Sequence, residues 1–124
     1  MNQVLWAGQV LVALLFGGAG FVHSIGYAQA SKNPGMAWMR AVPAPMVKTI
    51  GILEILGAIG LILPGLTGIL TWLTPLAAVL LGVVMVFAIA FHVSRREAPN
   101  TIFNAILGLL AFAVAFGRIV VSPF

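Results

Sequence analysis

Long apolar stretches separated by short polar segments dominate the chain. Four of them, residues 4–22, 46–63, 72–92 and 102–121, each hold about twenty residues with almost no charge. At a rise of about 1.5 Å per residue, a helix of that length crosses a hydrocarbon layer of about 30 Å. Only helices or closed barrels satisfy the backbone in lipid, and the stretches lack the alternation of barrel strands. The pattern predicts an all-α, integral membrane, antiparallel four-helix bundle in one transmembrane domain, residues 1–124.

The connections differ in character. Residues 32–45 contain Pro34, Pro43 and Pro45 together with Trp38. Because proline interrupts helices and tryptophan favours the headgroup layer, we expect an interfacial loop with Trp38 as an anchor. The second span should end at Leu63, with a turn over residues 65–71. Residues 28–30 (AQA) have the form of a signal-peptide cleavage site, but the first apolar stretch is too long for one and no Lys or Arg precedes it, so we expect a retained span.

Composition and charge agree with a lipid environment. Hydrophobic residues make up 62% and charged residues 6% of the chain, against about 45–50% and about 25% in ordinary globular domains. The absence of cysteine excludes disulfides and thiolate metal sites. In a membrane protein the net charge of +4 indicates topology rather than nucleic-acid binding. We therefore expect the lipid bilayer as a partner, and we expect no nucleic acid.

The basic residues predict the orientation. Five of the six Lys and Arg residues lie in or beside the first and third connections: Lys32, Arg40, Lys48, Arg95 and Arg96. Only Arg118 lies on the opposite side. The positive-inside rule then places these connections in the cytoplasm and both termini outside, in a bacterial inner membrane.

Polar side chains from all four spans fall at similar depth. Glu54 lies within the second span, where a carboxylate costs about 2.5–3.5 kcal/mol on insertion scales. His23 closes the first span, His92 closes the third, and Asn104 opens the fourth. In an antiparallel bundle these residues share one half of the bilayer, with Glu54 about 10 Å from the same end. Met85 shares the helical stripe of His92.

Each of these residues allows a structural and a functional interpretation. Glu54 is either a buried acid bonded across helices or a functional group; it is ionised if His23 or His92 donates to it, and otherwise protonated. The histidines suit the headgroup level, and Asn104 suits an interhelical bond or a ligand contact. Arg118, near the opposite boundary, is expected to be a snorkelling anchor. No metal site is expected, because the two histidines and Glu54 come from three helices without an i, i+3 or i+4 ligand pair.

Several motifs together resemble the DoxX and DoxX-like family of small bacterial membrane proteins. They are residues 20–23 (GFVH), 50–69 (IGILEILGAIGLILPGLTGI), 72–85 (WLTPLAAVLLGVVM), the pair His92 and Arg95, and residues 116–118 (FGR). His23 stands where the family has lysine, so no role of that lysine is carried over. The resemblance implies a four-helix subunit linked to quinone redox systems, such as a thiosulfate:quinone or terminal quinol oxidase subunit, or to oxidative-stress and quinone or catechol detoxification. Glu54, His92 and Arg118 match the family pattern.

Three functional hypotheses follow. In the first, the protein belongs to a quinone-linked redox system: Glu54 and His92 relay a proton, His23, Met85 and Asn104 join them in binding the ligand, and a partner supplies electrons. The quinone is implied by the resemblance, and no covalent cofactor is expected. In the second, the protein is a proton-coupled small multidrug-type transporter. In the third, it is a non-catalytic structural subunit of a larger complex. We expect a homo-oligomer or an association with a redox-partner subunit.

Overall fold

The computed structural model describes residues 1–124, and every regular element in it is helical. The elements are α1 (Asn2–His23), α2 (Tyr27–Ala30), the 3₁₀ helix η1 (Pro34–Ala41), α3 (Ala44–Thr67), α4 (Leu73–Ser94), α5 (Ala98–Phe116) and the π-helical turn η2 (Gly117–Val121). Four helices are long and apolar enough to cross a membrane: α1, α3, α4, and α5 continued by η2. The predicted four-helix membrane bundle is confirmed, and the chain is a multi-pass membrane protein.

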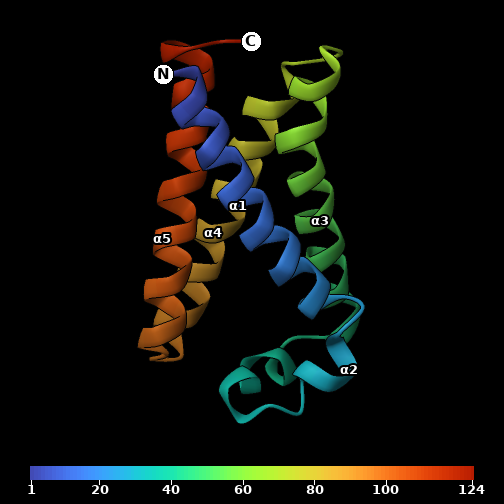
Figure 1. Cartoon of the computed structure of the whole chain (residues 1–124). Helices are drawn as coiled ribbons and strands as arrows, with labels where there is room; N and C mark the ends of the chain where they lie inside the picture. Colours follow the sequence, from blue (N-terminus) through green and yellow to red (C-terminus); the bar gives the residue numbers. More distant parts are fainter.

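The four long helices alternate in direction, so both termini lie at the same end of the bundle (Figure 1). Packing is closest between α1 and α3 and between α4 and α5, which gives two helix pairs. Helix α1 runs diagonally, from beside α5 near the termini to beside α3 at the opposite end (Figure 1). The helix pairs therefore meet near the termini and separate toward the end where α2 and η1 lie.

Two glycines bring α1 and α3 into backbone contact. A Cβ atom added to Gly20 would lie 2.5 Å from the carbonyl oxygen of Gly51. One added to Gly51 would lie 2.9 Å from Cβ of His23. Small residues permit this approach, which replaces the hydrophobic drive that is missing in lipid. Gly51 lies one helical turn before Glu54 on α3. The contact therefore holds the end of α1, and with it His23, beside Glu54.

Helix α3 is longer than the sequence suggested. The expected end at Leu63 is wrong, because the helix continues through Pro64 and ends at Thr67, before the left-handed Gly68 (φ 71°). Proline leaves the carbonyl four residues earlier without its helical donor. Here that carbonyl, of Gly60, accepts a hydrogen bond of 3.0 Å from the hydroxyl of Thr74 on α4. A neighbouring helix thus satisfies the freed group, as membrane helices require.

The core is apolar and the outer surface is apolar as well. Most large side chains that face outward are Leu, Ile, Val or Phe and are exposed to the lipid. The buried cluster draws on all four long helices and comprises Val12, Phe16, Leu61, Ala78, Leu81, Met85, Leu107, Ala111, Val114 and Ala115.

Arg118 does not extend to the surface as the expected snorkelling anchor. It is 3% exposed, and its Nε donates to Oε1 of Gln9 at 2.6 Å. Its Nη1 donates to Oδ1 of Asn2 at 2.7 Å and to the carbonyl of Ser122 at 2.9 Å. The Phe124 ring covers the guanidinium at 4.0 Å from Cζ. Because α1 offers two amide acceptors at this depth, the guanidinium is held inside the bundle and joins η2 to α1, while its Nη2 is enclosed without a hydrogen-bond partner.

Candidate functional site

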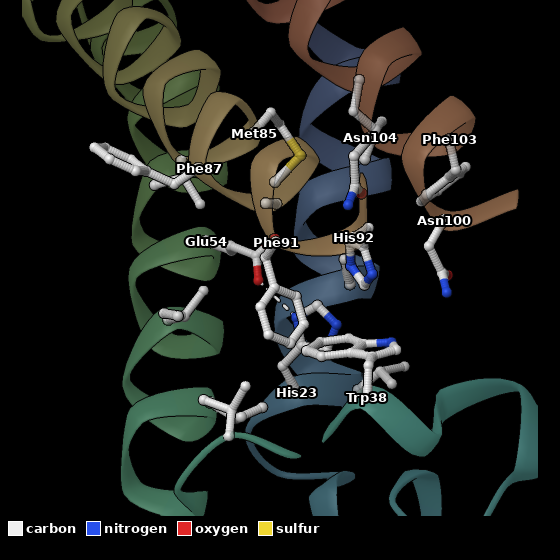
Figure 2. Close-up of a pocket in the computed structure, with 18 of the residues that line it drawn as sticks. His23, Trp38, Glu54, Met85, Phe87, Phe91, His92, Asn100, Phe103 and Asn104 are labelled. Atoms are coloured by element: carbon white, nitrogen blue, oxygen red, sulfur yellow. Dashed lines mark hydrogen bonds and ion pairs between the residues drawn. The ribbon is translucent and has the colours of Figure 1, made fainter. Parts of the chain in front are cut away.

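A pocket of about 610 Å³ lies where the two helix pairs separate. We call this end, which carries Lys32, Arg40, Lys48, Arg95 and Arg96, the basic end. The pocket has 22 lining residues, of which 16 are hydrophobic, and they come from α1, η1, α3, α4, α5 and the residue after η1. All the residues singled out from the sequence at this end line it: His23, Trp38, Glu54, Met85, His92 and Asn104 (Figure 2).

Glu54 pairs with His23. Nδ1 of His23 lies 2.7 Å from Oε1 of Glu54, so the end of α1 is bonded to the middle of α3. The Glu54 side chain is 2% exposed and that of His23 is 17% exposed. Of the two donors that the sequence offered for this acid, the structure uses His23, because the glycine contact between α1 and α3 carries it there.

His92 pairs with a different carboxylate, which the sequence analysis missed. Its Nδ1 lies 2.7 Å from Oε1 of Glu97, in the connection between α4 and α5. The imidazole is almost fully buried, whereas Glu97 is 21% exposed. Two histidine–carboxylate pairs therefore stand at the basic end, one joining α1 to α3 and one closing α4.

The way in which α4 ends explains the second pair. The backbone N–H of Glu97 donates to the carbonyl of His92 at 2.9 Å, and that of Arg96 donates to Val93 at 3.0 Å. Arg96 is left-handed, with φ 57°. This is a Schellman motif, in which the residue after the left-handed position contacts the residue five earlier. That contact is often hydrophobic, but here it joins a carboxylate to an imidazole. The sequence signal for this contact was the spacing of five residues between His92 and Glu97, across a helix end that Pro99 follows.

Glu97 is an ionised group at the edge of the bilayer. Partial burial opposes its ionisation, but hydrogen bonds from His92 and Arg95 and their positive charges outweigh that effect. The pKa of Glu97 is therefore lowered from its ordinary value of 4.5. Nε of Arg95 lies 3.2 Å from the same oxygen that His92 contacts. At neutral pH this position carries a negative charge within reach of water.

Trp38, expected from the sequence as an interfacial anchor, is half-buried and lies between the two histidines. Its ring meets both imidazoles edge to face, with centroid separations of 5.2 Å and interplanar angles of 82° for His23 and 86° for His92. Figure 2 shows Trp38 beneath both rings. The 3₁₀ turn of η1 directs this side chain into the bundle, while the next residue, Met39, is fully buried. The segment expected to lie on the bilayer thus closes the pocket.

Several polar atoms at the pocket have no partner within the chain. Each histidine uses only Nδ1, Glu54 uses only Oε1, and no hydrogen bond involves the side-chain amides of Asn100 or Asn104. None of these atoms is fully enclosed by protein, because the one enclosed side-chain atom without a partner belongs to Arg118. The site therefore offers donors and acceptors to a ligand with an apolar body and a polar head.

Comparison with known families gives one result that decides the classification. The sequence profile of the DoxX-like family matches residues 7–114. The chain belongs to the DoxX-like family. Neither curated proteins nor solved structures give a match. In this DoxX-like protein the matched region contains every residue that lines the pocket, whereas Arg118 lies beyond it.

Proposed function

We propose that this DoxX-like protein binds a quinone head group in the pocket and exchanges protons with it, as the membrane component of a quinone-linked redox system. The observation that carries the proposal is a pair of histidine–carboxylate contacts, both 2.7 Å, whose two histidines line one apolar pocket. In each pair the imidazole keeps a second nitrogen without a partner in the chain.

The shape and lining of the pocket suit such a ligand. Small-molecule sites commonly enclose about 300–1,000 Å³, with apolar walls and a few polar groups. This pocket has that size, and the aromatic rings of Trp38 and Phe91 offer faces and edges for a planar ring. The carbonyl oxygens of a quinone accept hydrogen bonds and the hydroxyls of a quinol donate them. Imidazole can serve both forms, because each ring nitrogen is either donor or acceptor.

The proton chemistry requires two groups. Reducing a quinone to a quinol consumes two electrons and two protons. A protonated imidazole can release one proton through its free nitrogen while its Nδ1–H stays bonded to the carboxylate, and two such pairs supply two protons. Glu54 and Glu97 stabilise the protonated rings by their charge. In this proposal the electrons come from a partner subunit, and oxidation of a quinol runs the same transfers in reverse.

Charge distribution supports an orientation for this system. Five of the six Lys and Arg residues lie at the basic end and Arg118 lies at the other. By the positive-inside rule the basic end faces the cytoplasm of a bacterial inner membrane. The redox partner would then reach the pocket from the cytoplasmic half of the bilayer.

Quinone retention tests the proposal directly. Wild-type protein and Glu54→Gln are purified gently from their own membrane and analysed by native mass spectrometry and lipid extraction. Gln keeps an acceptor for His23 but loses the charge. A charge-assisted hydrogen bond contributes about 1.5–3 kcal/mol, so we expect quinone affinity to fall by roughly 10- to 150-fold. Thr74→Val is the matched control, because it removes a hydrogen bond between α4 and α3 outside the pocket.

The alternatives predict different results in the same preparations. If neither protein retains quinone but other subunits co-purify with both, the pocket pair is structural. A proton-driven flux in liposomes that disappears in Glu54→Gln would identify a transporter instead. Equal quinone retention in wild type and in an equally folded Glu54→Gln protein would refute the proposed site.

A further inference from the structure

We infer that His92 and Glu97 form a proton path between the aqueous phase at the basic end and the pocket, whereas His23 and Glu54 form an internal pair without such a path. The nature of the ligand rests on the proposed function, but the path rests on geometry alone. It assigns Glu97 the role of the group that exchanges protons with water.

The two pairs differ in their exposure to water. Glu97 is 21% exposed and lies in a connection outside the spans, whereas Glu54 is 2% exposed within α3. The order is reversed for the histidines, because His92 is 4% exposed and His23 17%. Along α4 the buried imidazole thus stands between the pocket and an accessible carboxylate. Along α1 the carboxylate is the innermost group and has no accessible acid behind it.

The charges around each carboxylate reinforce this difference. Glu97 faces His92 from α4 and Arg95 from the same connection, both within hydrogen-bond distance of Oε1. Glu54 faces His23 from α1 and makes no other ion pair. Arg95 is itself partly exposed, so the carboxylate that it holds remains in contact with water. Glu97 can therefore accept a proton from the ring or from the solvent without crossing an apolar region.

Each transfer conserves protons and needs no additional reactant. On ligand oxidation, a hydroxyl proton passes to Nε2 of His92, the proton on Nδ1 passes to Oε1 of Glu97, and Glu97 releases a proton to water. On reduction the same three transfers run in the opposite direction. Reduction therefore returns the ring to the tautomer from which oxidation began. One proton crosses from the pocket to the aqueous phase, or back, in each cycle.

The fixed backbone of the α4 terminus keeps the path in register. Both hydrogen bonds of the Schellman motif hold Glu97 under His92, and the hydroxyl of Thr101 on α5 donates to the Glu97 carbonyl at 3.0 Å. A surface loop without these bonds would leave the carboxylate free to swing into solvent. The structure thus positions an exposed acid against a buried imidazole through three backbone contacts.

Nitrogen-15 NMR of the full-length protein in nanodiscs tests the path without any quinone. The chain has two histidines, so selective histidine labelling resolves both rings. We expect the ring protons of His92 to exchange with water faster than those of His23. Glu97→Gln should slow the His92 exchange by roughly 10²-fold, a usual contribution of a positioned proton-transfer group. Glu97→Asp, or formate added to Glu97→Gln, should restore part of the rate, which a purely structural role would not predict.

Each outcome decides one statement. The inference is overturned if His92 exchanges no faster than His23 in the wild-type protein, a comparison that needs no variant. It is also overturned if Glu97→Gln leaves the His92 exchange unchanged. A separate measurement of quinone binding by the same wild-type preparation tests the proposed function. A protein that binds no quinone but shows Glu97-dependent exchange would retain the path and lose the quinone proposal.

Discussion

The two ends of the bundle contain buried polar side chains that are used in opposite ways. Near the termini Gln9 is bonded on both sides, because its Nε2 donates to the carbonyl of Leu61 at 2.6 Å and its Oε1 accepts from Arg118. At the basic end each histidine is bonded once, to a carboxylate, and its other nitrogen has no partner within the chain. Similar groups in a similar medium thus serve packing at one end and provide a pocket at the other.

The difference lies in the geometry of the helices. Where α1 and α5 meet, the polar atoms of Arg118 are enclosed by amides and by the rings of Phe124 and Trp6, so little space is left for a ligand. Where the helix pairs separate, one pair does not enclose the polar atoms of the other, and these atoms face a pocket. Both acids of the chain, Glu54 and Glu97, lie at the open end. We therefore expect substitutions near the termini to change stability and those at the basic end to change binding.

The largest effect is expected for Arg118→Leu. It removes three charge-assisted hydrogen bonds and leaves the acceptors of Gln9, Asn2 and Ser122 unpaired, which should lower the free energy of unfolding by about 3 kcal/mol. Unfolding in mixed detergent micelles measures it. Arg118→Lys keeps the charge but lacks the planar fork, so its stability should be intermediate. Quinone binding by the folded fraction should not change. A loss of binding at unchanged stability would contradict the division between the two ends.

Gly51→Ala should affect both properties, because Gly51 lies where packing and pocket meet. Its added Cβ would press on the backbone of Gly20 and Ser24 and on Cβ of His23, all within 2.9 Å. Overpacking of this kind costs about 1–3 kcal/mol, and here it would also move His23 away from Glu54. Thermal unfolding and quinone binding report the two effects. Gly17→Ala is the matched control, since its Cβ would meet α3 at an ordinary 3.7 Å. Equal behaviour of the two variants would disprove the role assigned to this contact.

Arg96→Gly should stabilise the protein. A left-handed residue with a Cβ costs about 1–2 kcal/mol, which glycine removes while the Schellman motif and the His92–Glu97 pair remain. The thermal unfolding temperature should rise. Arg96→Ala separates this effect from the loss of charge, because alanine keeps the Cβ and should give no gain. If both variants gained equally, backbone strain would not be the cause.

The smallest effect concerns the pH dependence of the His92–Glu97 pair. The pKa of Glu97 is lower in the folded than in the unfolded protein, so its stabilisation is present above the ordinary value of 4.5 and is lost as pH falls through the folded pKa. Because Glu97 is partly exposed, we expect less than about 1 kcal/mol. Wild type should unfold at a higher temperature than Glu97→Gln at pH 7, and the difference should vanish in acid. A difference that persists below the folded pKa would show that the charge of Glu97 does not stabilise the fold.

Much of the fold followed from the sequence, but parts of the site did not. Pro64 led us to expect a helix end, but the helix continues through it. The donor that satisfies the carbonyl of Gly60 lies on another helix, so no local sequence pattern shows it. The sequence predicted an interfacial position for Trp38 but not the contact of its ring with both histidines, because the direction of a 3₁₀ turn is not visible in composition. Glu97 was overlooked because its contact with His92 depends on a left-handed residue that is not glycine. In each case the deciding partner was fixed by backbone geometry rather than by residue type.

The sequence by itself determined the four spans. It also determined that four polar residues lie at the same end of the bundle: His23, Glu54, His92 and Asn104. Transfer into lipid is a property of local apolar stretches, and the constant rise of a helix converts position in the chain into depth. Only the tertiary structure decided which histidine meets which carboxylate and that Arg118 is enclosed. Those outcomes depend on how each helix is rotated about its axis and how each one ends, because hydrogen bonds form only within a few tenths of an ångström of their preferred length.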